Sequence, residues 1–395
     1  MTLAVAKSFA PARPRLSDRE ALDLYRHASI HELGRRAHEV TQRLHPEPYR
    51  TYVVDRNINY ANYCTAKCIF CNFKADPPGM DTGRKDLPGG YVLTFEQIGS
   101  KVEELIAIGG TQILMQGGLV PAEMLPLSWY CDLLRFIKNE YPGIHIHAFS
   151  PPEIHAFHEI FDMSVPDVLL RLQDAGLDSI PGGGAEILVD RVREKIAQGK
   201  TTTEQYLHVM REAHRIGMRT SVTMMFGHIE TIPERIEHLR RIRELQDETG
   251  GFTAFICWTF QPGDTPLGRV PPLPPDDDSQ PDGKHLRLAD AHEYLRTVAI
   301  ARLYLDNIPN LQASWVTQGV KIGELSLFFG VNDMGSVMME ENVVSAAGTT
   351  YHLTEQEIRA TIRDAGWVPK KRNFHYQIID GVDGVDQRDA REPIR

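Results

Sequence analysis

The stretch TYVVDRNINYANYCTAKCIFCNF (51–73) joins an apolar run to three closely spaced cysteines. Its first part, residues 51–58, predicts a buried strand. Cys64, Cys68 and Cys71 follow at once, in the spacing Cys-x-x-x-Cys-x-x-Cys. In a barrel of parallel strands, the loops that follow the strands form the reaction face. The three thiols therefore lie where chemistry is expected.

The rest of the chain repeats the order of strand and then helix. Apolar runs that predict strands alternate with longer runs whose apolar residues recur at helical spacing. Continuous apolar strands of this kind are typical of a parallel sheet that is covered on both faces. The pattern predicts an α/β fold, a TIM-like barrel that is complete or partly open, with a C-terminal extension. A doubly wound open sheet is the alternative. After the first strand, the expected strands are 111–116, 144–150, 177–180, 219–227, 252–262, 311–316 and a weaker one near 331–338. The expected helices include residues 186–196 and 318–330.

Three segments are expected along the chain. Residues 1–50 form an N-terminal helical segment, in which Ser17 and Glu20 make a capping box. Residues 51–290 form the barrel core, and residues 291–395 supply elements that complete or cap the barrel. The Pro- and Asp-rich run 268–285 predicts a surface loop, and both chain ends are expected to be frayed.

Composition excludes several classes of protein. The 395 residues are 42% hydrophobic and 24% charged, which excludes wholesale disorder and coiled coil. The net charge of −10 argues against a nucleic-acid partner, since no excess of cations is present to attract phosphates. No apolar run approaches the roughly 18 residues of a membrane span, and the N-terminus does not resemble a signal peptide. These features predict a cytoplasmic protein.

Cysteine placement indicates a metal site. Cys131 and Cys257 lie alone in apolar runs and are expected to be buried packing residues. The cysteine trio can present three thiolates to three irons of a cubane, which leaves one iron for an added chelator. Zinc is the competing interpretation, but no His, Asp or Glu lies between Asn57 and Lys74 to complete a local zinc site.

The cysteine trio, with Phe70 before its last member, resembles the cluster loop of the radical SAM superfamily. That resemblance implies one 4Fe–4S cluster on Cys64, Cys68 and Cys71 and an S-adenosyl-L-methionine molecule on the open iron. Reductive cleavage would then give a 5′-deoxyadenosyl radical, with an electron donor such as flavodoxin or ferredoxin. In the superfamily, the loop after the second strand contacts the methionine amino group, and here that position holds Gln116, Gly117 and Gly118.

Longer segments resemble one group within the superfamily, which makes menaquinone by the futalosine route and also makes deazaflavin. They include residues 171–193, 210–231, 241–262 and 338–348, and they most resemble the cyclic dehypoxanthine futalosine synthase family. The resemblance implies a small-molecule nucleoside substrate, hydrogen abstraction from its ribose, and attack of the carbon radical on the attached benzoate ring. Aminofutalosine synthase and the deazaflavin-forming subunit are alternatives within the group. A non-enzymatic iron–sulfur carrier is a remote alternative from another class.

Polar residues that follow predicted strands are candidates for the barrel mouth, although each can equally serve as a cap or hydrogen-bonding support. Phe70, Ser150 and the backbone of Gly182, Gly183 and Gly184 are expected to bind cofactor, or the three glycines simply form a turn. His228 and Glu230 are candidates for the base that takes the last proton. Glu230 has an alternative role as a cap of the next helix, so His228 is the better candidate. The remaining candidates at the mouth are Asn57, Asn59, Glu186, Thr259 and Gln261.

Overall fold

The computed structural model describes residues 15–81, 83–84, 88–274, 281, 283–340, 342, 345–348 and 351–379. The expected frayed ends lie outside these residues, except Arg15. Within the described chain, ten strands form one sheet, in which each neighbouring pair is parallel. In sheet order the strands are β12 (Val368–Lys371), β1 (Tyr49–Val53), β11 (Asp333–Ser336), β10 (Asn310–Gln312), β9 (Phe252–Thr259), β8 (Arg219–Phe226), β6 (Ser179–Ile180), β5 (His145–Ala148), β4 (Gln112–Gln116) and β2 (Asp55–Asn59).

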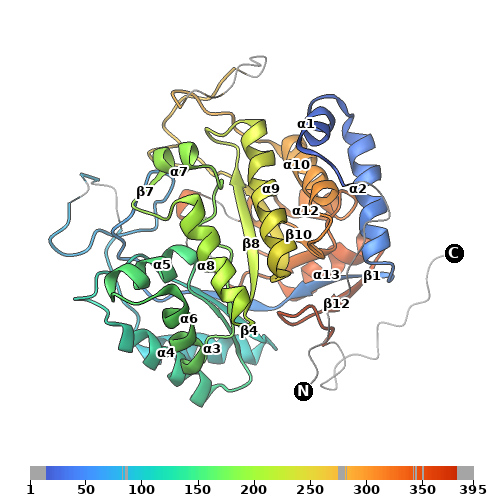
Figure 1. Cartoon of the computed structure of the whole chain (residues 1–395). Helices are drawn as coiled ribbons and strands as arrows, with labels where there is room; N and C mark the ends of the chain where they lie inside the picture. Colours follow the sequence, from blue (N-terminus) through green and yellow to red (C-terminus); the bar gives the residue numbers. More distant parts are fainter. Residues whose placement is uncertain are drawn as a thin grey trace.

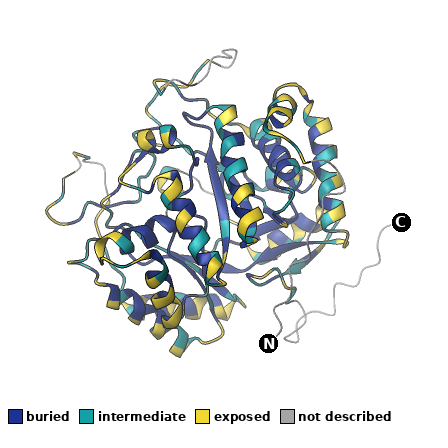
Figure 2. Cartoon of the chain, viewed as in Figure 1, coloured by how far each residue is buried: buried dark blue, intermediate teal, exposed yellow. Residues whose placement is uncertain are grey.

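Helices surround the curled sheet and bury its outer face (Figures 1 and 2). Their inward residues are apolar and buried, while the outward faces are exposed, as amphipathic spacing requires. The predicted TIM-like barrel is confirmed, and the doubly wound sheet is not found. The helices are α1 (Asp18–His27), α2 (Ile30–Leu44), α3 (Phe95–Ala107), α4 (Leu127–Glu140), α5 (Pro151–Ile160), α6 (Val165–Ala175), α7 (Asp190–Ile196), α8 (Thr203–Arg215), α9 (Ile232–Thr249), α10 (Ala291–Tyr304), α11 (Trp315–Gln318), α12 (Val320–Ser326), α13 (Glu355–Asp364) and the short 3₁₀ turn η1 (Ser345–Ala347).

The first predicted strand is divided into two parts that pair with opposite ends of the sheet. β1 pairs with β11 and β12, whereas β2 pairs with β4 along its whole length. Only Val54 separates the two parts. The sheet therefore curls until its ends meet within this one strand, and the residues that lead into the cysteine loop belong to the closure of the barrel.

Three other expected elements differ from the structure. The strand predicted at 311–316 ends at Gln312, and a helix begins at Trp315. The helix predicted from Glu186 begins only at Asp190, because Glu186 has a φ of +40°, which a helix cannot contain. The helix predicted at 318–330 is observed only as α12, because Gly319, with a φ of +79°, separates Gln318 from it.

The C-terminal segment after β12 closes the lower end of the barrel, where the strands begin. Arg372 forms a fully buried ion pair with Asp333, with Nε–Oδ2 and Nη2–Oδ1 distances of 2.6 and 3.0 Å. Phe374 stacks on His145 of β5 at 4.5 Å between ring centroids. Tyr376 packs against Arg372, whose guanidinium carbon Cζ lies 4.0 Å from the centroid of the tyrosine ring. This lower plug, residues 372–376, reaches from β11 to β5.

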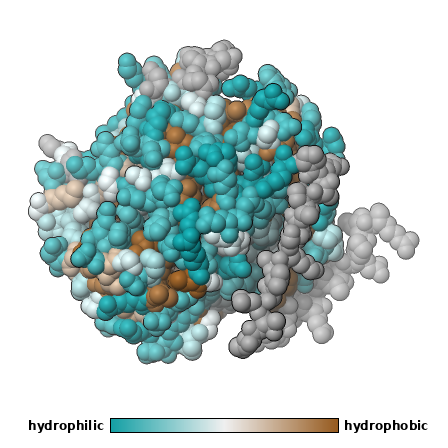
Figure 3. Space-filling model, in the orientation of Figure 1, coloured by the Kyte–Doolittle hydropathy of each residue, from teal (hydrophilic) through white to brown (hydrophobic). Residues whose placement is uncertain are grey.

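The N-terminal helical segment packs on the outside of the barrel beside α9 and α10 (Figure 1). The predicted capping box is confirmed, since Ser17 and Glu20 bond to each other's backbone N–H groups. Residues 268–285 are described only in part; Leu286 beyond them is buried and bonds to the backbone of Pro271 and Leu273. The molecular face in Figure 3 is mainly hydrophilic, with scattered hydrophobic residues.

Candidate functional site

The cysteine loop lies over the upper end of the barrel and is held there by backbone hydrogen bonds. Its strand β3 (Lys67–Cys68) pairs antiparallel with β7 (Ala197–Gln198), which follows α7. Ile69 donates to the carbonyl of Ile196 at 2.9 Å and accepts from Leu267 at 2.8 Å. The loop is thus fixed by chain segments far away in the sequence, and its three cysteines line one cavity.

Burial controls the ionisation of the thiols. Cys68 is buried, and Cys64 and Cys71 are half-buried. Burial raises the pKa of Cys64, only partly offset by the Leu119 N–H that donates to its Sγ at 3.3 Å; burial also raises the pKa of Cys68. The bare thiols of Cys64 and Cys68 are therefore neutral, and a bound metal must displace their protons.

The donor set fits an iron–sulfur cluster better than a single zinc ion. A zinc ion needs all its sulfur ligands within about 2.3 Å of one point. Among the described residues, no three Cys, His, Asp or Glu side chains are placed to hold one ion, although the three cysteines share the cavity. Three separated thiols in a loop suit three different irons of a larger cluster.

The loop after β4 passes directly under the cysteine loop. A Cβ on Gly118 would lie 2.1 Å from the carbonyl oxygen of Tyr63 and 2.7 Å from the Cβ of Cys64, so only glycine fits. The Gly117 N–H donates to Glu153 at 3.0 Å. Gln116 and both glycines line the cavity, as predicted from their position after a strand.

Ser150 and the glycine run also line the cavity. The Ser150 hydroxyl donates to Glu153 at 2.6 Å as part of the cap of α5, so the side chain is already engaged. A Cβ on Gly183 would lie 2.4 Å from Nε2 of Gln116, and Gly184 has a φ of +84°. The run is therefore both a turn and a wall of the cavity, and it can offer a ligand only its backbone.

A buried ion pair beside the cysteine loop was not predicted from sequence. Lys200 is 2.8 Å from Glu186 and lies 5.4 Å from the ring centroid of Phe70. Burial alone would raise the pKa of Glu186, but Lys200 and Arg193 hold it below the usual range. Glu186 was expected at the mouth, whereas Lys200 stands alone in a short connection and carries no motif. The pair places a cation and an anion next to the cluster loop.

His228 and Glu230 are not among the residues that line the cavity. Both are fully buried, and Nδ1 of His228 lies 3.0 Å from Glu230. Glu230 also pairs with Arg235 at 2.8 Å and accepts the Gly227 N–H at 2.7 Å. Burial would raise the pKa of Glu230, but His228 and Arg235 outweigh it and lower the pKa. A base role for either residue stays a prediction, without a cavity contact to support it.

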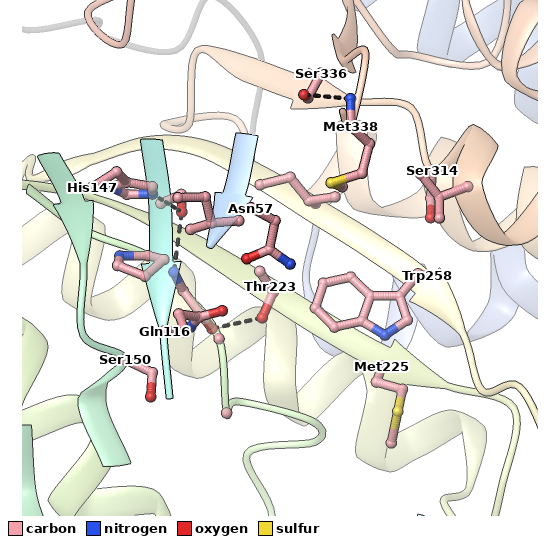
Figure 4. Close-up of a pocket in the computed structure, with 18 of the residues that line it drawn as sticks. Asn57, Gln116, His147, Ser150, Thr223, Met225, Trp258, Ser314, Ser336 and Met338 are labelled. Carbon is pink, nitrogen blue, oxygen red and sulfur yellow. Dashed lines mark hydrogen bonds between the residues drawn. The ribbon is translucent and has the colours of Figure 1, made fainter. Parts of the chain in front are cut away.

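The cavity has a volume of about 430 Å³ and extends from the cysteine loop down the inside of the barrel to the lower plug. Figure 4 shows Asn57, Gln116, Thr223 and Trp258 gathered around it. Oδ1 of Asn57 is buried without a hydrogen-bond partner. The inner wall is thus polar along the strands and apolar on the side of Trp258, which suits a ligand that carries both hydroxyl and aromatic groups.

Family models match most of the chain. The model described as the Radical SAM superfamily matches residues 58–242, and that of the CofH/MqnC C-terminal region matches residues 249–384. The chain belongs to the radical SAM superfamily, and within it to the family that carries the CofH/MqnC C-terminal region. Members of this superfamily use a 4Fe–4S cluster and S-adenosyl-L-methionine, and the cysteine loop and the cavity described above fit that pair of cofactors.

Curated relatives cover nearly the whole chain. Cyclic dehypoxanthine futalosine synthase of Halalkalibacterium halodurans is 46% identical over 92% of this chain and 92% of its own. The 5-amino-6-(D-ribitylamino)uracil–L-tyrosine 4-hydroxyphenyl transferase of Methanopyrus kandleri is 37% identical over 88% of this chain and 89% of its own. Aminodeoxyfutalosine synthase of Thermus thermophilus is 36% identical over 94% of both.

A solved structure confirms the fold independently. Methylornithine synthase superimposes with a TM-score of 0.65 at 18% identity, over 90% of this chain and 94% of its own. That likeness concerns the barrel alone. None of the described helices has the length and apolar character needed to cross a membrane.

Proposed function

We propose that this chain is a radical SAM cyclase that converts dehypoxanthine futalosine into cyclic dehypoxanthine futalosine for menaquinone biosynthesis. The observation that carries the proposal is the identity of 46% to a cyclic dehypoxanthine futalosine synthase across 92% of both chains. The two alternative activities belong to relatives that are 37% and 36% identical.

The chain's own residues would do three things for this reaction. Cys64, Cys68 and Cys71 would bind the cluster, which together with S-adenosyl-L-methionine supplies a 5′-deoxyadenosyl radical when bound. The backbone at Gln116–Gly118 and Gly182–Gly184 would hold the nucleotide, because glycine permits close approach there. The enclosed barrel would exclude water from the radical chemistry.

The substrate would lie deeper in the barrel than the cofactors. Its ribose hydroxyls require acceptors, and Oδ1 of Asn57 is a buried acceptor without a hydrogen-bond partner. Its aromatic ring would pack on the apolar side of the cavity near Trp258 and Met225. Such a site binds a small nucleoside without any contribution from a second macromolecule.

We further propose that flavodoxin or ferredoxin supplies the electron and that the enzyme works in the cytoplasm without a nucleic-acid partner. The net charge of −10 supports the last point, since phosphate binding needs an excess of cations.

The test is an anaerobic assay of the reconstituted enzyme with dehypoxanthine futalosine, S-adenosyl-L-methionine and dithionite, followed by mass spectrometry. The cyclase releases 5′-deoxyadenosine and a product that is lighter than the substrate by two hydrogen atoms. An aminofutalosine synthase would instead keep the adenosyl group in its product, and the deazaflavin subunit would require tyrosine. Turnover of either alternative reaction in place of the cyclisation rejects the proposal. Absence of product from the substrates of all three reactions rejects it as well.

A further inference from the structure

A chain of hydrogen bonds runs down the inner wall of the barrel from His147 at the cavity to His145 at the lower end. Nδ1 of His147 is 2.6 Å from Oγ of Ser179, and the same oxygen is 2.7 Å from Nε2 of His145. Nδ1 of His145 then lies 4.0 Å from the carboxylate of Asp178. This His–Ser–His relay arises because residues 145 and 147 point to one face of β5, with Ser179 of β6 between them.

The relay connects two environments. His147 lines the cavity (Figure 4) and is 6% exposed, whereas Ser179 is fully buried. Phe374 of the lower plug stacks on His145 and also contacts the His147 ring at 4.8 Å between centroids, which covers the cavity end of the relay from below. The outer end reaches solvent, since the side chains of His145 and Asp178 are 18% and 32% exposed.

The cavity end of the relay is available to a ligand. Nε2 of His147 contacts Oγ of Ser221 at a long distance of 3.4 Å, and that hydroxyl also accepts the Gly182 N–H at 3.0 Å. Burial, and then the neighbouring His145 and Arg372, lower the pKa of His147 well below its usual value. The imidazole is therefore neutral at pH 7 and cannot retain an added proton.

We propose that His147 accepts the proton that leaves the substrate ring and that Ser179 and His145 pass it to Asp178 and solvent. This inference rests on the proposed cyclase function. The ring C–H bond breaks and its proton bonds to Nε2 of His147, while the Nδ1 proton moves to Ser179. The Ser179 proton moves to Nε2 of His145, which gives up its Nδ1 proton. The electron left on the ring would be taken up by a one-electron acceptor, a role that an oxidised iron–sulfur cluster held by Cys64, Cys68 and Cys71 would supply.

The relay explains how an enclosed barrel releases a proton without admitting water. After the carbon radical attacks the ring, aromaticity returns only when a proton and an electron are both lost. A neutral acceptor beside the ring, linked to a chain that ends outside, removes the proton in one direction. His228 has no such link to the cavity, since its contacts are with Glu230, the Ile229 N–H and the Met225 carbonyl.

The first test compares the ratio of cyclised product to 5′-deoxyadenosine in single turnovers. We expect Ser179→Ala to lower the ratio about tenfold and His147→Gln about a hundredfold, with uncyclised or reduced substrate accumulating. Ser326→Ala is the matched control, because Ser326 is equally buried but donates only to Gly323 outside the cavity. Its ratio should equal that of the wild type.

The second test needs no cofactor. In metal-free protein with ¹⁵N-labelled histidine, NMR should show His147 neutral and protonated on Nδ1, with that proton signal displaced in Ser179→Ala and retained in Ser326→Ala. A His147 that is protonated on Nε2 overturns the relay, as does an unchanged product ratio in folded Ser179→Ala. A wild type that forms no cyclised product rejects the cyclase function and the relay's role together. An active wild type with unaffected variants rejects the relay alone.

Discussion

The two ends of the barrel are built in opposite ways. At the upper end, glycines and backbone hydrogen bonds hold a loop of closely spaced thiols over the cavity. At the lower end, Arg372 of the lower plug forms an ion pair with Asp333 of β11, and Phe374 packs on His145 of β5. The upper end is therefore completed by a ligand, whereas the lower end is complete as a folded chain.

This difference separates function from stability within one fold. Conformational choices at the upper end, such as glycine at 118, let the loop after β4 approach the cysteine loop closely. The lower end gains its rigidity from buried pairs that tolerate no missing partner. Changes at the two ends should accordingly affect different measurements, and the largest effects should be losses of activity at the top.

Replacing one cysteine of the loop should abolish the chemistry while leaving the fold intact. Cys64→Ala, Cys68→Ala or Cys71→Ala each removes one of three iron ligands, so we expect loss of the cluster's charge-transfer absorbance and of all S-adenosyl-L-methionine cleavage. Iron content and visible absorbance after anaerobic reconstitution measure this, with Cys131→Ala as control. A single variant with a full cluster and normal turnover would contradict the assignment.

Removing Arg372 should instead lower the stability of the fold. In Arg372→Met, Asp333 stays buried without its cation, which costs about 3–5 kcal/mol of unfolding free energy. Urea unfolding of the metal-free protein measures the loss. Arg241→Met is the matched control, because its pair with Glu237 is partly exposed and worth at most about 1 kcal/mol. Equal unfolding free energies of the two variants would show that the ion pair of Arg372 and Asp333 does not stabilise the fold.

The sequence was sufficient to predict what local spacing encodes. The cysteine trio, Gln116–Gly118 and the repeated strand–helix order all follow from residues that are close in sequence, and the structure places each where it was expected. The early end of the strand at Gln312 was not predictable, because apolar residues continue to Val316 and only the tertiary fold decides where pairing stops.

What the sequence could not provide are contacts between distant segments. Arg372 meets Asp333 because β1 pairs with both β11 and β12. Lys200 meets Glu186 because α7 and the connections on either side of it bring the two residues together. The division of the first strand at Val54 depends on β4 and β11, far along the chain. Isolated histidines such as His147 carry no motif, so the relay becomes visible only once β5 and β6 are paired.

A smaller effect should appear in acid. The pKa of Glu230 is lowered in the folded state, so its ionisation stabilises the fold above the unfolded pKa of about 4.3, and this contribution is lost as pH falls through the folded pKa. In Glu230→Gln the stability difference between pH 7 and pH 4 should shrink by on the order of 1 kcal/mol. Urea midpoints at the two pH values measure it, and an unchanged acid slope would mean that Glu230 does not titrate with unfolding.

His228 tests whether the buried network near the upper end belongs to the chemistry or to the scaffold. Because His228 does not line the cavity, we expect His228→Gln to keep product and 5′-deoxyadenosine coupled and to lose about 1–2 kcal/mol of stability. Deuterated substrate and mass spectrometry measure the coupling. Accumulation of uncyclised material in this variant, with His147→Gln unaffected, would restore His228 as the base.

The smallest effect is expected at Cys257, which lies in a strand of the barrel and not in the cysteine loop. Cys257 lies in β9, is 2% exposed, and burial raises the pKa of its thiol to about 12, so the side chain behaves as a small apolar group. Cys257→Ala should leave iron content unchanged and lower the unfolding free energy by on the order of 1 kcal/mol, through one lost packing contact. Iron analysis and urea unfolding on the same sample separate the two effects. Loss of iron would mean that Cys257 takes part in the metal site. The cysteines that bind metal would then not be confined to the cysteine loop.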